Sequence, residues 1–109
     1  MNDLLVIVGP TAVGKSAIAI ELAQRLDGEI VSADSRYLYR GMDIGTAKPT
    51  PADRARAPHH LIDVTDPDQP WSLAQFCDAA DVVIGEINRR GRLPILAGGA
   101  GQYIHALLE

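Results

Sequence analysis

The residues from Gly9 to Ser16 have the types and spacing of a phosphate-binding loop. Their sequence, GPTAVGKS, matches G-x-x-x-x-G-K-[ST] at every fixed position, after an apolar run and before a helical pattern. Glycines let backbone amides turn toward an anion, and the N-terminus of the following helix favours negative charge. Lys15 is expected to contact the terminal phosphates, and the Ser16 hydroxyl to join a Mg²⁺ shell. The motif predicts binding of a di- or triphosphate without selecting ATP.

A second polar group follows the apolar pair Ile30-Val31, in the sequence EIVSADSRYLY from Glu29 to Tyr39. In a doubly wound sheet ligands bind beyond the carboxyl ends of the strands, so Asp34 is expected at the same edge as the phosphate loop. Its carboxylate has three possible roles. With Ser35 it could cap a helical turn, it could bind the water shell of Mg²⁺, or it could act as general base on an acceptor. Residue types and spacing leave all three open.

Strand and helix patterns alternate along the chain that must position these residues. Strands are expected at residues 4–8, from residue 30, at 60–64 and at 93–97, and helices at 16–26, 51–57, after Ser72 and at 100–108. Gly98-Gly99 is expected to be a turn, and Asp27-Gly28 to end the first helix. Because parallel strands need crossover connections, the alternation predicts an α/β fold, with a parallel sheet flanked by helices as in P-loop NTPases.

The helix after Ser72 has the clearest signals. Ser72 is expected to be its N-cap, Gln75 to complete a capping box, and Trp71 to pack against Phe76 as a hydrophobic staple. Gly91 fits the C-terminal end. One face of the helix is apolar, and it is formed by Leu73, Phe76, Cys77, Ala80, Ile84 and Ile87.

Composition limits the remaining possibilities. The chain has 109 residues, of which 47% are hydrophobic and 22% charged, enough for one modest domain. It has no apolar run long enough for a membrane span, no basic start typical of a secretory signal, and one cysteine, Cys77, which is expected in the core of a cytoplasmic protein. A net charge of -4 argues against binding nucleic acid by bulk charge alone, although it leaves a local basic patch possible.

Further charged residues lie in or near the expected loops at the edge that carries Asp34. Asp63 follows the third expected strand and could be a carboxylate on the metal side or an acid that shapes a turn. Lys48 belongs to a loop that starts at this edge and is expected to make an active-site contact. The pattern assigns no role to Arg40 or Arg54.

Two other clusters are expected to be structural. His59 and His60 are adjacent, so they point to opposite faces of a strand, and no other Cys or His joins them. They are expected to shape the start of the strand rather than bind a metal. Arg89, Arg90 and Arg92 lie at a helix end, where cations suit the helix dipole. We expect a solvated helix end at the opposite edge of the sheet.

Four stretches in this order resemble the N-terminal part of the tRNA dimethylallyltransferases, also called tRNA isopentenyltransferases: GPTAVGKS, VSADSRYLYRGMDIGTAKP, PHHLIDV and GGAGQY. The resemblance extends from Leu4 to Leu108, and DIGTAKP after ADS is far more specific than the phosphate loop. It implies that residues 1–109 are the N-terminal part of a P-loop nucleoside triphosphate hydrolase-like domain. Enzymes of this family move a dimethylallyl group from its diphosphate to N6 of an adenine next to the anticodon in tRNA.

The resemblance also implies roles for individual residues. Asp34 would accept the proton from the adenine amino group, with Lys15 and Thr11 among the catalytic contacts to the donor. The RNA contacts would come from Asp34, Ser35, Arg36, Tyr37 and Ala100. The donor diphosphate would be held by Gly9, Pro10, Thr11, Ala12, Val13, Gly14, Lys15 and Ser16, with Mg²⁺ at Ser16 as the cofactor. The full-length protein is expected to be a monomer in the cytoplasm, with tRNA and dimethylallyl diphosphate as partners.

The sequence departs from the family pattern at two positions. Ala100 stands where the family usually has a threonine that contacts RNA, and Tyr37 where it often has glutamine, so Tyr37 could stack rather than donate a hydrogen bond. Family members are roughly three times as long, so the 109-residue piece alone is expected to have little or no transferase activity, and its sheet to be left with an open edge.

Other functions remain open on the residues alone. A small-molecule kinase could use the same loop on ATP, and an adenylate isopentenyltransferase would modify free AMP. A nucleotide-binding regulatory module could keep the loop without the acceptor chemistry. Asp34 together with an intact Lys15 argues against the regulatory module, and DIGTAKP favours the RNA enzyme over the AMP enzyme.

Overall fold

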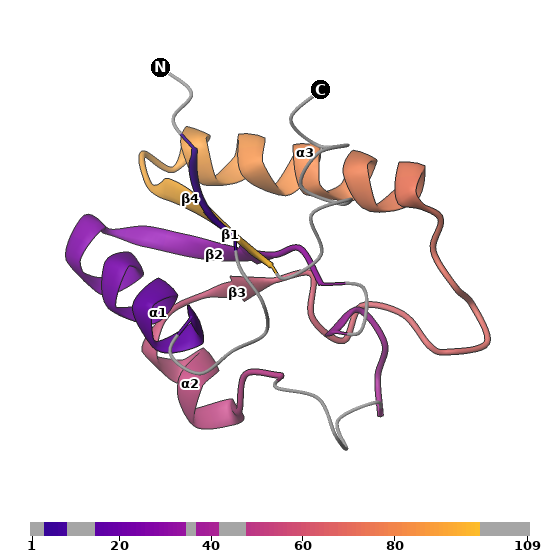
Figure 1. Ribbon diagram of the computed structural model, residues 1–109. Coiled ribbons are helices and arrows are strands. Elements are labelled where there is room, and N and C mark those ends of the chain that lie inside the picture. The colour runs from indigo at the N-terminus through magenta and orange to yellow at the C-terminus, as the bar shows by residue number, and fades with distance from the viewer. Residues whose placement is uncertain (1–3, 9–14, 35–36, 42–47, 99–109) are drawn as a thin grey trace.

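The computed structural model describes residues 4–8, 15–34, 37–41 and 48–98, and all structural statements below concern those residues. Strands and helices alternate in them, as the sequence predicts (Figure 1). In chain order the elements are β1 (Leu5–Val8), α1 (Lys15–Leu26), β2 (Gly28–Ser32), α2 (Pro51–Arg56), β3 (His59–His60), α3 (Leu73–Arg89) and β4 (Leu93–Gly98).

The four strands form one sheet in the order β1-β4-β2-β3, with every pair parallel. The predicted parallel α/β fold is therefore confirmed. Val8 pairs with Gly98, and Ser32 pairs with Ala97, so β1, β4 and β2 end at nearly the same level. This alignment creates one carboxyl edge from three strands that are far apart in sequence. In the described part of the sheet β1 and β3 are the outer strands, and β4, the last strand in sequence, is internal.

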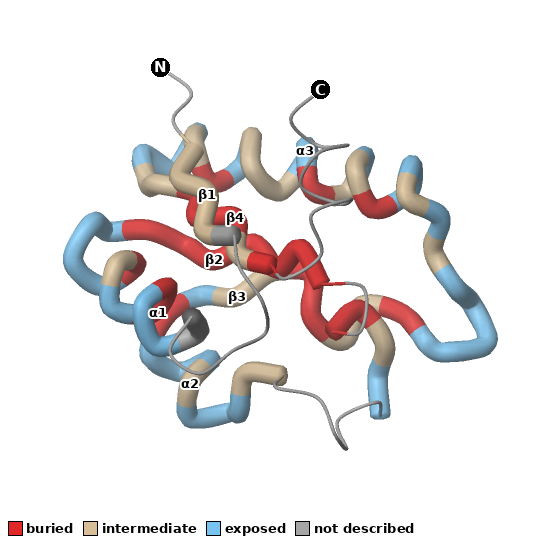
Figure 2. The backbone as a smooth tube through the Cα atoms, in the orientation of Figure 1, coloured by how far each residue is buried: buried red, intermediate tan, exposed pale blue. Residues whose placement is uncertain are grey.

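Helices cover both faces of the sheet (Figure 1). On one face α1 packs on the strands, and α2 lies against α1. On the other face α3 packs on β2 and β4, and the buried residues follow the strands and the inner sides of the helices (Figure 2). The α1 side of the core contains Ala19, Ile20, Ala23, Ile30, Ala57 and Ile95. The α3 side contains Val31, Ala33, Leu38, Leu61, Phe76, Ala80, Ile87 and Leu96.

Helix α3 forms as its signals predict. The Ser72 hydroxyl accepts a hydrogen bond from the Gln75 amide at 3.1 Å, and the Gln75 side chain accepts one from the Ser72 amide at 2.8 Å, which completes the capping box. Trp71 and Cys77 are partly buried against the cluster that contains Phe76. Gly91 has a φ of 74° just past the helix, as expected of a C-terminal glycine. Within the described ranges no helix is both long and apolar enough to cross a membrane.

The third predicted strand is mostly wrong. A strand was expected at residues 60–64, but β3 contains His59 and His60 alone. Leu61 and Asp63 have φ values of 66° and 56°, which no β-strand allows. The chain instead turns twice and returns to an extended pairing at Thr65, which forms a parallel bridge with Tyr39. An apolar sequence favoured a strand here, and contacts from other segments determined the backbone instead.

Two glycines belong to strands: Gly28, expected with Asp27 to end the first helix, which does end at Leu26, and Gly98, expected in a turn. Gly28 is the first residue of β2 and Gly98 the last of β4. A Cβ at Gly28 would lie 2.8 Å from the Leu93 carbonyl oxygen, and one at Gly98 would lie 2.6 Å from the Ala33 carbonyl oxygen. Neighbouring backbones approach too closely for any side chain at either position, and for that reason these strand ends need glycine.

Candidate active site

Asp34 lies at the carboxyl edge of the sheet, directly past β2. The Ala33 amide still donates a hydrogen bond to the Ala97 carbonyl of β4, at 2.9 Å, and this bond fixes the backbone just before Asp34. The Tyr37 amide then donates to the Asp34 carbonyl at 3.0 Å, so the chain turns immediately. Asp34 is only 4% exposed. The predicted position of Asp34 is thus confirmed, while its chemical role remains a prediction.

The phosphate loop connects two elements that meet this edge. β1 ends at Val8, opposite Gly98, and α1 begins at Lys15. The predicted donor residues Gly9, Pro10, Thr11, Ala12, Val13 and Gly14 lie outside the described residues, as do Ser35, Arg36 and Ala100. Lys15 and Ser16 are described as part of the α1 backbone only. Tyr37, the remaining predicted RNA contact, is buried at 8% exposure.

Ser32 is a polar residue at this edge that the sequence analysis did not single out. It is the last residue of β2 and alternates with Val31, so it shares the α1 side of the sheet with Ile30. Its hydroxyl is buried and has no hydrogen-bond partner in the described part of the chain. A buried hydroxyl without a partner is uncommon in folded proteins and calls for an explanation. It could donate to a phosphate oxygen or accept from a Mg²⁺-bound water near the start of α1.

Asp63 forms ion pairs with two cations. Lys48 Nζ lies 2.6 Å from Asp63 Oδ1 and also donates to the Tyr39 carbonyl at 3.0 Å. Arg54 of α2 lies 3.3 Å from Asp63 Oδ2. Of the two alternatives for Asp63, these contacts favour the acid that shapes a turn over the metal-side carboxylate. Lys48 makes structural contacts here, and Arg54, which the sequence left unassigned, takes part in the same cluster.

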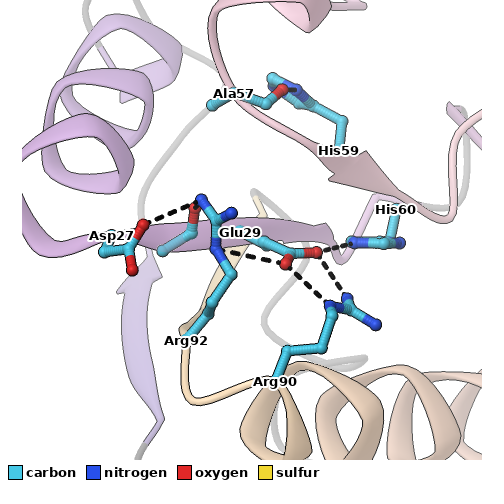
Figure 3. Close-up of polar contacts among 8 residues, drawn as sticks. Asp27, Glu29, Ala57, His59, His60, Arg90 and Arg92 are labelled. Carbon is cyan, nitrogen blue, oxygen red and sulfur yellow. Dashed lines mark hydrogen bonds and ion pairs between the residues drawn. The ribbon is translucent and has the colours of Figure 1, made fainter.

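A solvated helix end was expected for the three arginines at the opposite edge. They are at least partly exposed, but two of them also pair with a carboxylate. Two of them bind Glu29, a buried residue of β2 whose side chain is 5% exposed (Figure 3). Arg90 donates to both carboxylate oxygens, at 3.1 and 2.7 Å. Arg92 lies 3.3 Å from Asp27, and its Nε lies 3.4 Å from Glu29, an ion-pair distance without hydrogen-bond geometry. A buried carboxylate requires such partners. The sequence around Glu29 did not indicate which residues they would be.

His60 completes this cluster, and His59 points elsewhere (Figure 3). His60 Nε2 lies 2.7 Å from Glu29 Oε1, and His59 Nδ1 lies 2.8 Å from the Ala57 carbonyl. Burial favours a higher pKa for Glu29, but the hydrogen bonds from Arg90 and His60 outweigh it and lower the pKa. The two histidines form β3 itself, which agrees with the prediction that they shape the start of this strand. Among the described residues no three His, Cys, Asp or Glu side chains form a metal-binding group.

Two protein families match the sequence. The IPP transferase family matches residues 37–109, and the isopentenyl transferase family matches residues 2–62. The tRNA dimethylallyltransferase of Chloroflexus aurantiacus is 63% identical over all 109 residues, which are 37% of that protein. That of Roseiflexus sp. is also 63% identical over the whole chain, which is 36% of the relative. The chain thus spans little more than a third of the length of these relatives.

Solved structures agree in fold. The tRNA isopentenylpyrophosphate transferase of Bacillus halodurans superposes with a TM-score of 0.93 at 53% identity, covering 98% of this chain and 35% of that one. A eukaryotic dimethylallyltransferase acting on tRNA superposes with a TM-score of 0.90 at 35% identity, covering 95% of this chain and 26% of the other. Since the first family match alone covers most of the sequence, the chain belongs to the IPP transferase family.

Proposed function

We propose that this chain is the donor-binding and catalytic part of a cytoplasmic, monomeric enzyme that transfers a dimethylallyl group from dimethylallyl diphosphate to N6 of an adenine next to the anticodon in tRNA. The observation that carries the proposal is the position of Asp34. It is a buried carboxylate at the carboxyl edge, just past β2, and only β4 separates β2 from β1, the strand that leads into the phosphate-loop motif. The names of the relatives support the substrate pair.

The proposed reaction needs a base and a site for the leaving group. Adenine N6 forms a bond to the allylic carbon, and the bond from that carbon to the diphosphate oxygen breaks. An exocyclic amine is a weak nucleophile because its lone pair is delocalised into the ring, so removing its proton assists the attack. Asp34 accepts that proton. Lys15 and the backbone N–H groups of the phosphate loop, to which Pro10 contributes none, bind the departing diphosphate and stabilise the charge that develops on it.

Mg²⁺ fits the donor set available at this edge. When bound, it neutralises charge on the diphosphate. Mg²⁺ usually keeps several waters and takes few protein ligands besides substrate phosphates, so a dedicated cluster of acids is not required. The Ser16 hydroxyl is the ligand proposed from the motif. The unpaired Ser32 hydroxyl, on the α1 side of the sheet, is suited to a water or phosphate oxygen of the same complex.

Two other reactions are tested against the transfer to tRNA. The match of residues 2–62 to the isopentenyl transferase family leaves free AMP as an alternative acceptor. A small-molecule kinase would use ATP as the donor and transfer phosphate rather than an alkyl group. Transfer to AMP would need the same base at adenine N6, so Asp34 argues only against the kinase, and the acceptors differ in that an RNA adenine must leave its stack to be reached.

The test uses a completed enzyme, in which this chain replaces the 109 matching residues of the Chloroflexus aurantiacus relative. The completed enzyme, the relative itself and the 109-residue chain are incubated with labelled dimethylallyl diphosphate, Mg²⁺ and unmodified tRNA. Parallel reactions contain AMP as acceptor or labelled ATP as donor. Circular dichroism confirms that each protein is folded.

The expected result is label in tRNA with the completed enzyme and none with the 109-residue chain. An Asp34→Asn variant should lower the rate by about 10²- to 10⁴-fold, the usual contribution of a general base. An Asp66→Asn variant, which changes an exposed acid of a surface loop, serves as the matched control and should keep the rate. Label in AMP alone, or phosphate transfer from ATP, would overturn the proposal, provided that the relative is active in the same assay.

A further inference from the structure

The turn that carries Asp34 is held from the far side by residues 63–65. The Asp63 amide donates to the Tyr37 carbonyl at 2.9 Å, and the Val64 amide donates to the Leu38 carbonyl at 2.8 Å. In the opposite direction, the Arg40 amide donates a hydrogen bond to the Thr65 carbonyl at 2.9 Å. Since Tyr37 in turn donates to the Asp34 carbonyl, a continuous chain of backbone hydrogen bonds joins Asp63 to Asp34.

The Asp63 side chain ties this pairing to two other segments. Lys48 bridges Asp63 Oδ1 and the Tyr39 carbonyl, so one ammonium group contacts both paired segments. The Lys48 side chain is only 7% exposed, so water screens this ion pair poorly. Arg54 adds a contact from α2 to the other oxygen, where the cation is 38% exposed and the ion pair is therefore weaker.

The backbone around Asp63 is strained. Leu61 has a φ of 66° and is buried, an unusual conformation for a bulky residue. Asp63 follows at 56°, where aspartate is better tolerated. Such conformations persist only when surrounding contacts enforce them, and they are concentrated at functional sites. Here the enforcing contacts are the ion pairs of Asp63 and the bonds to residues 37–40.

We propose that Asp63 is a positioning residue for the transfer reaction: its carboxylate, held by Lys48 and Arg54, fixes the backbone that places Asp34. This inference rests on the proposed function, because it assumes that Asp34 is the base. Asp63 contacts no reacting group itself. Its effect passes through the Tyr37 carbonyl and the Asp34–Tyr37 turn.

The cluster also gives Lys48 a different role from the expected one. A lysine that binds the donor would need its charge available to phosphate. The Lys48 charge is compensated by Asp63 at 2.6 Å. On this inference Lys48 assists catalysis by orienting the backbone, and the phosphate contact comes from Lys15. Lys48→Arg should therefore retain much of the activity and Lys48→Met should not, with the donor KM little changed in both.

The test is a double-mutant cycle in the completed enzyme. Asp63→Asn removes the negative charge, keeps the side-chain shape and suits a positive φ, so the backbone gains no new strain. The variants Asp34→Asn, Asp63→Asn and the double variant are compared by single-turnover transfer of the dimethylallyl group. Asp66→Asn is the matched control, since Asp66 is three residues away and also pairs with an arginine, Arg40, at 3.2 Å on the exposed surface.

We expect Asp63→Asn to slow the reaction about tenfold at saturating donor, because a displacement of less than 1 Å already has a large effect on rate. In the Asp34→Asn background the same change should alter the rate less than about twofold, because residues that act as a unit are not additive. Asp66→Asn should be neutral. An equal loss in both backgrounds would show that Asp63 serves stability alone, and no loss in either would also overturn the proposal.

A second measurement separates this inference from the proposed function. Amide hydrogen exchange of Tyr37 follows the turn directly and requires no activity. Faster exchange of this amide in Asp63→Asn, but not in Asp66→Asn, is expected. If the wild-type completed enzyme transfers no dimethylallyl group, the proposed function is wrong, but the exchange result can still show that Asp63 fixes the backbone at Tyr37. If transfer occurs but neither the exchange nor the rate responds to Asp63→Asn, the positioning role fails and the function stands.

Discussion

Replacing Gly98 by alanine should displace Asp34, although the substitution leaves the Asp34 side chain itself unchanged. A Cβ on Gly98 would lie 2.6 Å from the Ala33 carbonyl oxygen and 2.8 Å from the Ala33 Cβ, well inside the 3.4 Å at which ordinary contact begins. Nearly all of this deficit must be met by moving backbone, because the obstructing atoms are a carbonyl and a methyl group rather than a flexible side chain. Ala33 directly precedes Asp34, so the carboxylate moves with it.

The magnitude follows from the size of this displacement. A shift of about 1 Å in a catalytic group can lower a rate about 10²-fold, so Gly98→Ala should lower the turnover of the completed enzyme by about that factor. Overpacking should also cost about 1–3 kcal/mol of folding stability. The two effects are measured separately, by single-turnover transfer of the dimethylallyl group to tRNA and by urea unfolding.

Gly28→Ala is the matched control. Its Cβ would meet the Leu93 carbonyl oxygen at 2.8 Å, an overlap of nearly the same kind in the same sheet. Gly28 lies at the amino end of β2, four residues before the end of the strand that leads to Asp34. We expect a similar loss of stability and a turnover within about threefold of wild type, since the displaced backbone is far from the reacting groups. Equal losses of turnover in the two variants would refute the reasoning.

Three further predictions concern single side chains. Ser32→Ala should leave the free energy of unfolding unchanged or raise it by about 1 kcal/mol, because the buried hydroxyl has no partner among the described residues. The same change should weaken the binding of Mg²⁺-pyrophosphate, measured by calorimetry, about tenfold. Unchanged binding would show that Ser32 does not belong to the donor site. Phe76→Ala should lower the free energy of unfolding by about 3–5 kcal/mol in urea titrations, because Phe76 is fully buried in the α3 side of the core. The lowered pKa of Glu29 means that its ion pairs stabilise the fold above the ordinary value of 4.5 and lose this effect as the pH falls through the lower folded-state value. The stability difference between wild type and Glu29→Gln should therefore shrink below about pH 4.5 in urea titrations, and a constant difference would contradict the assignment.

Local signals in the sequence were sufficient for most of the elements. The capping box of Ser72 and Gln75 fixes the start of α3, because both bonds lie within one turn. The alternation of strands and helices was enough to predict a parallel sheet and, with it, the edge that carries Asp34. These predictions needed no knowledge of which distant residues meet.

The errors came from contacts between distant segments. Apolar residues after His60 suggested a strand, but the pairing of Asp63 and Thr65 with residues 37–40 forces two positive φ values there. Gly98 was assigned to a turn because glycine marks turns, whereas the reason for it is the approach of Ala33 from another strand. Arg90 was expected in water because no short-range pattern could reveal Glu29, 61 residues earlier, as its partner.

The two charged clusters stabilise opposite edges of the sheet in different ways. Glu29 is buried, and its cluster ties β2 to β3 and to the end of α3 without reaching a loop with proposed chemistry. Asp63 is about one-third exposed and binds segments that follow the carboxyl ends of β2 and β3. Loss of the Glu29 charge should destabilise the sheet that its cluster joins, whereas loss of the Asp63 charge takes a carboxylate from the buried Lys48 and should mainly destabilise the segments after β2 and β3. Substitutions in the Asp63 cluster should therefore change the transfer rate, and substitutions in the Glu29 cluster should change the stability of the fold.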